Sequence, residues 1–394
     1  MNQKNKTKIL FVHHVSSYGG ASFCLLNIIR ELDRKNFLPT VLLKDEGPLV
    51  TELNKLKVRV IFEKSLTTVP YNTPFYSPKN TIEWLKLYFS LKKVKKIFKN
   101  SSASVIYLNT MMMHPYARIG RLTGKSVILH VREHWPKNQN TIQLKYAKNL
   151  IKKYANHIVA INKTSAEMVD IPERTTIIFD SVDFSNRCNN AKQKIINQTE
   201  KKTFLFLGGT QRIKGALDVV KVFDELTQSH KIELLILGLS NSSRKNIKYI
   251  IKSFLNLIGI YTYSEKIRRI VNNNPNIYTQ QSTYKVKEII EQSYCVVSYP
   301  TIPHAILPIA ESIWLEKPVI SADTPEAREY SENGKGAVLF EMNNSEDFKR
   351  KILYVLRNYD EIKMKTKLTK NFIQEKFSIN KNTKLLNNTL KKFH

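Results

Sequence analysis

Glu311 is the residue whose place in the chain most clearly suggests chemistry. Apolar runs rich in β-formers, Tyr294–Tyr299 and Lys317–Ala322, stand on either side of it and predict neighbouring strands of a buried parallel sheet. Ligands of open α/β sheets bind beyond the carboxyl ends of such strands, and the helix that carries Glu311 would begin there. Its carboxylate would then lie at an edge where ligands bind, although a capping or salt-bridging glutamate gives the same pattern and is favoured by this stretch alone.

Two strand-to-helix turns carry glycines or basic residues that suit a phosphate group. One follows the predicted strand Lys8–Val15, and the other follows the strand that begins at Thr203. Backbone N–H groups and the dipole at a helix N-terminus favour anions, and Arg and Lys side chains suit a diphosphate. Glycines that only provide a positive φ, or a solvated basic loop, explain the same pattern. The residues concerned are Gly19, Gly20, Gly208, Arg212 and Lys214.

A third polar group follows the predicted strand Ser126–Val131. His130 lies near the end of this strand, and Arg132, Glu133 and His134 follow it directly. This is more polar side chains than a turn requires, and they suit a sugar hydroxyl or an anion. A salt-bridged loop is the alternative interpretation.

Strands and helices alternate along the chain in the way needed to position these groups. With 394 residues the chain predicts two domains, and 42% apolar with 10% aromatic residues excludes a disordered protein. Alternating strand and helix patterns in both halves predict doubly wound parallel sheets. The polar stretch 186–201 lacks an apolar period and is the predicted linker between domains 1–185 and 202–375.

The composition restricts partners and compartment. The net charge of +30 favours a negatively charged partner such as phosphate, anionic lipid or nucleic acid. Cys24, Cys188 and Cys295 form no CxxC pair, which suits a reducing compartment and gives no zinc motif. No stretch approaches the roughly 18 apolar residues of a membrane span, and the first apolar run is too short for a signal peptide. We therefore expect a cytoplasmic protein.

The helix predicted over Ile82–Lys99 is basic and amphipathic, with Glu83 as its single acidic residue. Such a helix is typical of binding to an anionic membrane surface, where each lysine contributes on the order of 1 kcal/mol. The alternative is a sheet-covering helix with a solvated basic face, because every crossover helix buries an apolar stripe. The apolar stripe is Leu87, Leu91, Val94 and Phe98, the candidate membrane-surface lysines are Lys92, Lys93, Lys95 and Lys96, and the aromatic residues are Trp84, Tyr88 and Phe89.

The order of these motifs resembles the retaining family-4 glycosyltransferases (glycosyl transferases group 1) of the GT-B fold. The resemblance extends over nearly the whole chain. It rests on the strand–Gly-Gly–helix start, the Gly-(x)5-Lys-Gly pattern at Gly208–Gly215, the Pro-containing loop before Glu311, and the Lys-Pro-Val-Ile-Ser run from Lys317. Asp180-Ser-Val-Asp183 stands where that family commonly has Asn-Gly-x-Asp.

The resemblance implies an α/β protein with two facing Rossmann-like domains, a central cleft and a C-terminal helix, 376–394, that crosses back to the first domain. A UDP- or GDP-linked sugar would bind in the cleft. Lys214 would bind its diphosphate and Glu311 its ribose, while the backbone of Ile306 and Leu307 would lie along the diphosphate. The implied donor-binding set is Gly19, Gly20, Gly208, Arg212, Lys214, His304, Ile306, Leu307 and Glu311.

Besides Asp180, the sequence departs from the family pattern at three further places. Eight residues before Glu311 stands Pro303, where the family has a glutamate that touches the donor sugar; with a one-residue deletion, His304 takes that place. Gly209 replaces an arginine, for which Arg212 is the candidate substitute.

The third departure concerns the family's histidine that follows the Ser126–Val131 strand. In one alignment Arg132 stands in its place, with His130 two residues earlier. His130, Arg132 and Glu133 are the candidate catalytic residues.

These observations predict a cytoplasmic glycosyltransferase that moves a sugar from a nucleotide diphosphate to a glycan or lipid-linked acceptor in cell-surface polysaccharide synthesis. The family's front-face mechanism retains the anomeric configuration and lets the leaving phosphate take the acceptor's proton. No Asp-x-Asp motif lies near a strand end, so we expect no metal and no other cofactor. A peripheral position on the inner membrane face would follow if the basic helix binds lipid.

Two alternatives remain open. A GT-B scaffold also suits a nucleotide-sugar epimerase or a non-catalytic binder, which Pro303 and Gly209 favour. A polyanion- or nucleic-acid-binding protein is supported by charge alone. However, no helix-turn-helix, zinc-finger or RNP pattern is present and the basic residues are spread along the chain, so we expect no nucleic-acid partner.

Overall fold

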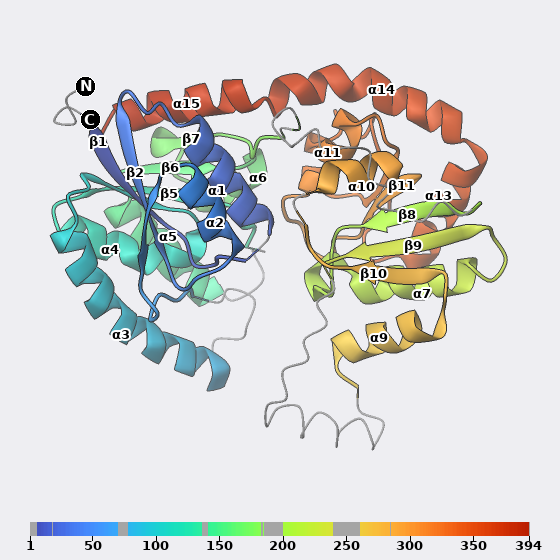
Figure 1. The fold of residues 1–394 in the computed structure, drawn as a ribbon, viewed down its shortest axis with the longest axis horizontal. Helices are drawn as coiled ribbons and strands as arrows, with labels where there is room; N and C mark the ends of the chain where they lie inside the picture. The colour runs from blue at the N-terminus through green and yellow to red at the C-terminus, as the bar shows by residue number, and fades with distance from the viewer. Residues whose placement is uncertain are drawn as a thin grey trace. The chain divides into compact units, whose positions relative to one another are not determined.

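The structure is a computed structural model that describes residues 6–17, 19–69, 78–135, 141–182, 184, 200–238, 261–283 and 285–393. The chain divides into two units (Figure 1). Unit 1 consists of Met1–Ser181 and Lys376–His394, and unit 2 of Val182–Glu375. Each unit is built around its own parallel β-sheet.

The sheet of unit 1 has seven strands in the order β3-β2-β1-β4-β5-β6-β7, all of them parallel. The chain turns from one side of the sheet to the other between β1 and β4, which therefore form its topological switch point. The strands are β1 Thr7–Val12, β2 Phe37–Leu43, β3 Arg59–Phe62, β4 Val105–Leu108, β5 Ser126–Val131, β6 His157–Ala160 and β7 Thr175–Ile177.

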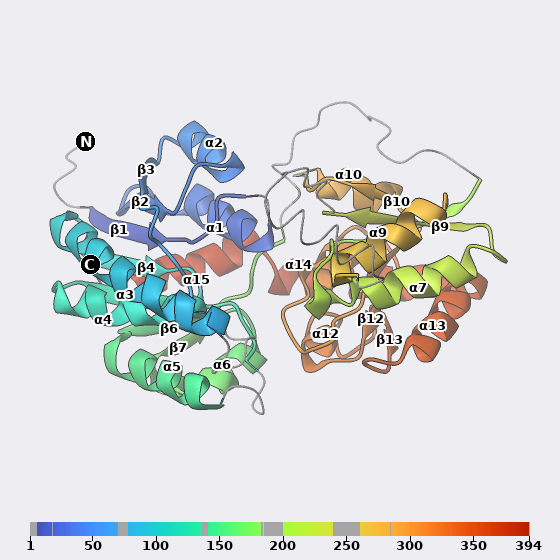
Figure 2. The same cartoon turned by 90° about the horizontal axis from the view of Figure 1, so that it is seen from below.

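Helices cover both faces of this sheet, as Figure 2 shows from below. Side chains alternate along each strand, so Leu10 and Val12 enter the core under α3, α4 and α5, whereas Ile9 and Phe11 enter the core with α1, α2 and α15. The helical elements are α1 Gly20–Glu31, α2 Pro48–Lys55, α3 Pro78–Asn100, η2 Met111–Met113, α4 His114–Leu122, α5 Thr141–Tyr154, α6 Lys163–Val169, η3 Pro172–Arg174 and α15 Ile379–Lys391.

Unit 2 repeats this architecture with six parallel strands in the order β10-β9-β8-β11-β12-β13. Its switch point lies between β8 and β11. The strands are β8 Lys202–Phe206, β9 Ile232–Leu237, β10 Ile277–Gln280, β11 Cys295–Ser298, β12 Val319–Ala322 and β13 Val338–Phe340. The helical elements are η4 Arg212–Lys214, α7 Ala216–Leu226, α9 Tyr263–Asn273, α10 Val286–Gln292, α11 Leu307–Trp314, α12 Pro325–Glu329, α13 Ser345–Arg357 and α14 Tyr359–Lys376.

The two doubly wound parallel sheets expected from the sequence are confirmed, and β11 pairs with β12 as predicted. Strand β1 ends at Val12, three residues earlier than the apolar run suggested, because His13 and His14 already belong to the polar loop. Of the predicted linker, only Glu200 and Lys201 are among the described residues. Within the described residues, no helix is long and apolar enough to cross a membrane.

Candidate functional site

Two loops meet at the switch point of unit 2. The loop after β8 contains η4, and the loop after β11 leads into α11. The backbone N–H of Thr301 donates to the carbonyl oxygen of Ile213 at 3.0 Å, and the Thr301 hydroxyl donates to the same oxygen at 3.2 Å. These bonds hold η4 against the β11 loop, so side chains from two distant stretches of sequence share one edge of the sheet.

Gly215 makes this close approach possible. Its φ is +66°, and an added Cβ would lie 2.4 Å from the carbonyl oxygen of Tyr299. Any other residue would be both strained and in collision with backbone at this position. Gly215 also precedes the first residue of α7, so the tight turn sets where that helix begins.

Lys214 and Glu311 approach each other across the two loops. Lys214 is half-buried at the end of η4, and Glu311 lies on α11 with 8% of its surface exposed. Burial lowers the pKa of Lys214, while the nearby Glu311 carboxylate acts to raise it. The Lys214 ammonium group and the Glu311 carboxylate therefore lie close enough to interact electrostatically at the switch point, where ligands of such sheets bind.

The start of α11 completes this region. Ile306 precedes the helix and is 2% exposed, and Leu307 is its first residue. No side chain among the described residues caps this N-terminus. Pro308 has no N–H, and Ile309 donates to the carbonyl oxygen of Ile306 at 3.1 Å, so among the first three residues of α11 only Leu307 keeps a backbone N–H for an anionic ligand.

Arg212 and His304 lie in the same loops but face other partners. The Arg212 guanidinium lies 5.2 Å from the ring centre of Tyr263, and the Tyr263 hydroxyl accepts from the backbone N–H of Leu217 at 2.9 Å. The Nδ1–H of His304 donates to the carbonyl oxygen of Ile302 at 2.9 Å, which bends the ring back onto its own loop. Arg212 is exposed, so its side chain remains accessible to a ligand.

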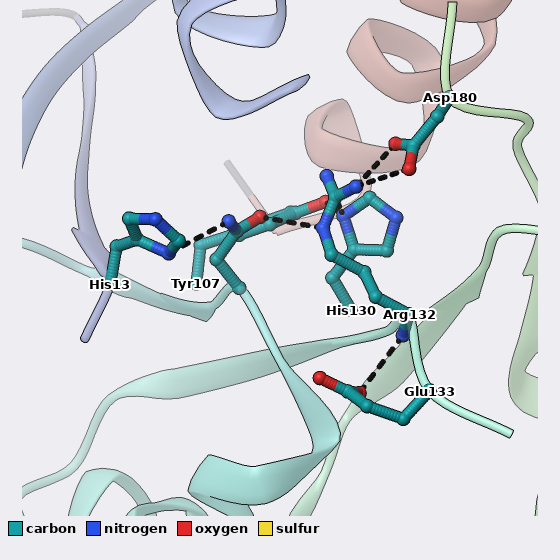
Figure 3. Close-up of polar contacts among 7 residues, drawn as sticks. His13, Tyr107, His130, Arg132, Glu133 and Asp180 are labelled. Atoms are coloured by element: carbon teal, nitrogen blue, oxygen red, sulfur yellow. Dashed lines mark hydrogen bonds and ion pairs between the residues drawn. The ribbon is translucent and has the colours of Figure 1, made fainter. Parts of the chain in front are cut away.

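A buried polar chain crosses the strand ends of unit 1 (Figure 3). The Asn109 amide donates to Nδ1 of His13 at 3.1 Å, so the neutral ring carries its proton on Nε2 and donates to Ser22 on α1 at 3.2 Å. Asn109 in turn accepts from Nε of Arg132 at 3.3 Å. The chain ends at Asp180, whose two carboxylate oxygens both accept from Nη1 of Arg132.

This ion pair is almost fully withdrawn from water. The Arg132 side chain is 6% exposed and that of Asp180 14%. Burial acts to lower the pKa of the guanidinium, but the Asp180 carboxylate, together with Cys24 and Tyr107, acts in the opposite direction, and the pKa of Arg132 is raised. Arg132 therefore keeps its charge inside unit 1.

His130 occupies a fully buried position beside this pair. Its Nδ1 accepts from the Tyr107 hydroxyl at 2.8 Å and from Nη2 of Arg132 at 3.3 Å, so Nε2 carries the proton of the neutral ring. Burial, and then the charge of Arg132, lower the pKa of His130 well below its usual value. Its Nε2 has no partner among the described residues. His130 lines a cavity of about 20 Å³ together with Asn27 and Asn382.

Glu133 faces the opposite way and closes a loop. Its carboxylate accepts from the Thr110 hydroxyl, from the backbone N–H of Met111 at 2.9 Å and from the backbone N–H of Arg132 at 3.2 Å. Burial raises the pKa of Glu133, although these hydrogen bonds act against that rise. The three candidate catalytic residues thus lie together at one sheet edge, and their catalytic role stays a prediction.

Gly19 and Gly20 lie at the exposed start of α1. Neither has a φ in the left-handed region, and a Cβ added to either would meet no atom within 4 Å. Neither conformation nor packing within the chain therefore requires a glycine here. A ligand that approaches the backbone closely would give such a requirement.

A larger pocket of about 480 Å³ opens at the carboxyl ends of β1, β2 and β3. The Ser16 hydroxyl donates to the Asp45 carboxylate at 2.8 Å, which shapes the pocket floor. Burial, and then the charge of Lys44, lower the pKa of His14 to about 4. The wall is rich in hydrogen-bonding groups from His14, Ser16, Ser17, Lys44, Asp45, Glu46, Thr67 and Thr68.

Some of these residues were not found from the sequence. Asn109 and His13 each directly follow a strand that flanks the switch point, and this position was the available signal. Tyr107 lies within β4, where an aromatic residue is ordinary core, and nothing in its sequence context distinguishes it. The expected membrane-surface lysines lie on α3 of unit 1 and are exposed.

Two doubly wound parallel sheets, each with polar groups gathered at its switch point, define the GT-B class of fold. HepE from Anabaena in complex with UDP and glucose shares this fold, with a TM-score of 0.73 at 17% identity over 98% of this chain and 99% of that one. Sucrose-phosphate synthase from Thermosynechococcus elongatus superimposes with a TM-score of 0.69 at 11% identity, covering 98% and 99%. A TarM mutant of S. aureus, in complex with fondaparinux, alpha-GlcNAc-glycerol and UDP, gives 0.70 at 12% identity, covering 97% and 99%.

Residues 189–375 match the model of the family Glycosyl transferases group 1. Unit 2 therefore contains a domain of this family. No curated protein sequence shows a significant match to the chain.

Proposed function

We propose that this protein is a retaining, metal-independent glycosyltransferase that moves a sugar from a UDP- or GDP-linked donor to a glycan or lipid-linked acceptor in cell-surface polysaccharide synthesis. The observation that carries this proposal is that the loops of Lys214 and Glu311 are joined by Thr301 at the switch point of unit 2, which brings the two side chains within electrostatic reach of each other. They lie in the part of the chain that matches the glycosyl transferases group 1 model. HepE, of the same fold, binds UDP and glucose.

The donor chemistry follows from the charges at this point. The Lys214 ammonium stabilises the diphosphate, on which negative charge grows as the glycosidic bond breaks. The backbone N–H of Leu307 and the dipole at the N-terminus of α11 also favour this anionic group. Glu311 accepts hydrogen bonds from the ribose hydroxyls, for which an acceptor-only carboxylate is suited. This supply of positive charge supports transfer without a metal ion.

The sugar then passes through an oxocarbenium-like state. In the proposed front-face reaction the leaving phosphate oxygen takes the proton of the acceptor hydroxyl, and the new bond forms on the side that the phosphate leaves. No dedicated protein base is needed for this step. A product with the donor's anomeric configuration, formed at an unchanged rate in the presence of EDTA, supports both proposals.

The acceptor side is proposed to be the pocket at the ends of β1, β2 and β3. Its carboxylate, hydroxyl and imidazole groups match the alternating donors and acceptors of a carbohydrate. The backbone at Gly19 and Gly20 leaves room for a phosphate to approach. We place the protein at the cytoplasmic face of the membrane, where lipid-linked acceptors are found.

Titration calorimetry with UDP, GDP and their sugars tests the donor site. Glu311→Ala and Lys214→Ala should each weaken binding at least tenfold, since each removes a charge-assisted contact worth about 1.5–3 kcal/mol. Glu291→Gln, an exposed glutamate on α10, is the matched control and should bind as the wild type does. Unchanged binding in Glu311→Ala and Lys214→Ala would contradict the proposed site.

A further inference from the structure

The apolar stripe of helix α3 that the sequence predicts is buried in the core of unit 1. Leu87, Val94 and Phe98 are at most 2% exposed and belong to the core of unit 1, and Leu91 packs against that core. The stripe therefore does not remain available for a membrane, and the covering-helix interpretation is correct for this face.

A second apolar face of α3 is exposed. Ile82, Leu85, Tyr88 and Phe89 have exposed fractions of 52%, 56%, 54% and 59%. Their spacing of three, six and seven residues places them on one side of the helix. Four large apolar side chains in a row on the surface are more than the scattered single residues that are usual for a soluble protein.

Helix α5 extends this face. Ile142 and Tyr146 are 60% and 46% exposed, and the Tyr146 ring lies edge-on to that of Trp84 with 5.9 Å between centres. Because Trp84 stands one helical turn before Tyr88, the exposed side chains of the two helices form one surface. This α3–α5 patch consists of Ile82, Leu85, Tyr88, Phe89, Ile142 and Tyr146.

The charges around the patch are almost all positive. Lys92 lies over the Tyr88 ring with its Nζ 4.7 Å from the centre, and Lys145 is exposed beside Tyr146. Glu83, the single acidic residue of the two helices, is already bonded to Lys86 at 2.8 Å. Lysine is depleted in the contact surfaces of proteins, whereas apolar side chains ringed by lysine suit an anionic bilayer.

We propose that unit 1 inserts the α3–α5 patch into the interfacial layer of an anionic membrane. Leu85 and Phe89 enter the acyl boundary, the two tyrosines lie at headgroup depth, and the surrounding lysines contact lipid phosphates. This surface deepens the proposed function by bringing a lipid-linked acceptor within reach. It does not depend on sugar transfer, because membrane binding can be measured without donor or acceptor.

Vesicle co-sedimentation of the full chain tests the proposal. The wild type should bind vesicles of equal parts phosphatidylcholine and phosphatidylglycerol more strongly than vesicles of phosphatidylcholine alone. Leu85→Ser/Phe89→Ser should lower the partition coefficient about a hundredfold, because burial of each apolar side chain raises this coefficient on the order of tenfold. Met364→Ser/Leu368→Ser, which changes two exposed apolar residues of α14, is the matched control and should bind like the wild type.

A second measurement reports insertion directly. Phe89→Trp should shift its fluorescence to shorter wavelength on vesicle binding and be quenched by lipids brominated in the acyl chain. Partition unchanged in Leu85→Ser/Phe89→Ser, or no quenching of Phe89→Trp, would overturn insertion and leave only surface adsorption. If the wild type forms a stable dimer and Leu85→Ser/Phe89→Ser is a monomer, the patch is a contact between two copies of the chain and the membrane proposal is wrong. Leu85→Ser/Phe89→Ser should still bind nucleotide-sugar as the wild type does. This measurement therefore tests the proposed function separately from membrane insertion.

Discussion

Arg132 and Asp180 offer the sharpest test of how the polar groups at the strand ends of unit 1 are held. Both depart from the pattern of the family that the sequence resembles, which has a histidine at the place of Arg132 in one alignment and commonly an asparagine at the place of Asp180. In the structure the two departures contact each other, since both Asp180 oxygens accept from the Arg132 guanidinium. We expect the two residues to act as one unit, in which each charge is tolerated only because the other is present.

The expected magnitudes follow from burial. With side chains only 6% and 14% exposed, removal of one partner leaves an uncompensated buried charge, which costs about 3–5 kcal/mol. Arg132→His and Asp180→Asn should each lower Tm by roughly 10 °C for a unit of this size. The double variant removes both charges and should stay within about 1 kcal/mol of the wild type.

Thermal and urea unfolding of the four proteins form a double-mutant cycle. Asp323→Asn provides the control, because it breaks the Arg328–Asp323 pair, whose side chains are 50% and 31% exposed, and exposed pairs contribute at most about 1 kcal/mol. Additive losses in the Arg132→His/Asp180→Asn variant would refute the reasoning, since independent residues add and coupled ones do not.

Two further predictions concern pH and the glycine turns. His13 and His114 are buried, and burial lowers the pKa of both side chains, that of His114 to about 4. Below pH 6.5 these histidines therefore bind protons in the unfolded chain but not in the folded chain. Stability should then fall with decreasing pH by up to about 1.4 kcal/mol per unit for each such histidine; urea unfolding at pH 5, 6 and 7 measures this, and a flat profile would contradict it. Gly20→Ala should leave Tm unchanged but weaken ligand binding, whereas Gly215→Ala should unfold unit 2 more easily because its Cβ meets the backbone. Equal Tm values for the two glycine variants would show that the assignment of their roles is wrong.

The two loops of unit 2 that carry Lys214 and Glu311 were predictable because their signals are local. A strand, a loop with Lys214 and a following helix lie within a few residues of one another, and the same holds for the stretch around Glu311. A parallel sheet brings the ends of its strands to one edge, so the order of motifs was enough to predict that these loops share it. The short strand β13 and helix α9 were not anticipated, since three residues of Val338–Phe340 give no period and α9 carries one fully buried apolar residue, Ile267.

The pairing of Arg132 with Asp180 could not be predicted in the same way. These residues are 48 positions apart, and no local pattern shows that one side chain turns inward to meet the other. Asn109 illustrates the same limit, because its link between His13 and Arg132 depends on the order of strands across the sheet.

Helix α3 shows both what the sequence alone determines and what tertiary packing decides. Its sequence alone established an amphipathic, basic helix, because the spacing of apolar residues and the density of lysines are properties of the chain itself. Tertiary packing decides which apolar face is buried. Leu87, Val94 and Phe98 belong to the core of unit 1, whereas Leu85 and Phe89 are exposed. Local pattern fixes what a helix can bury, and the neighbouring elements fix which side it buries.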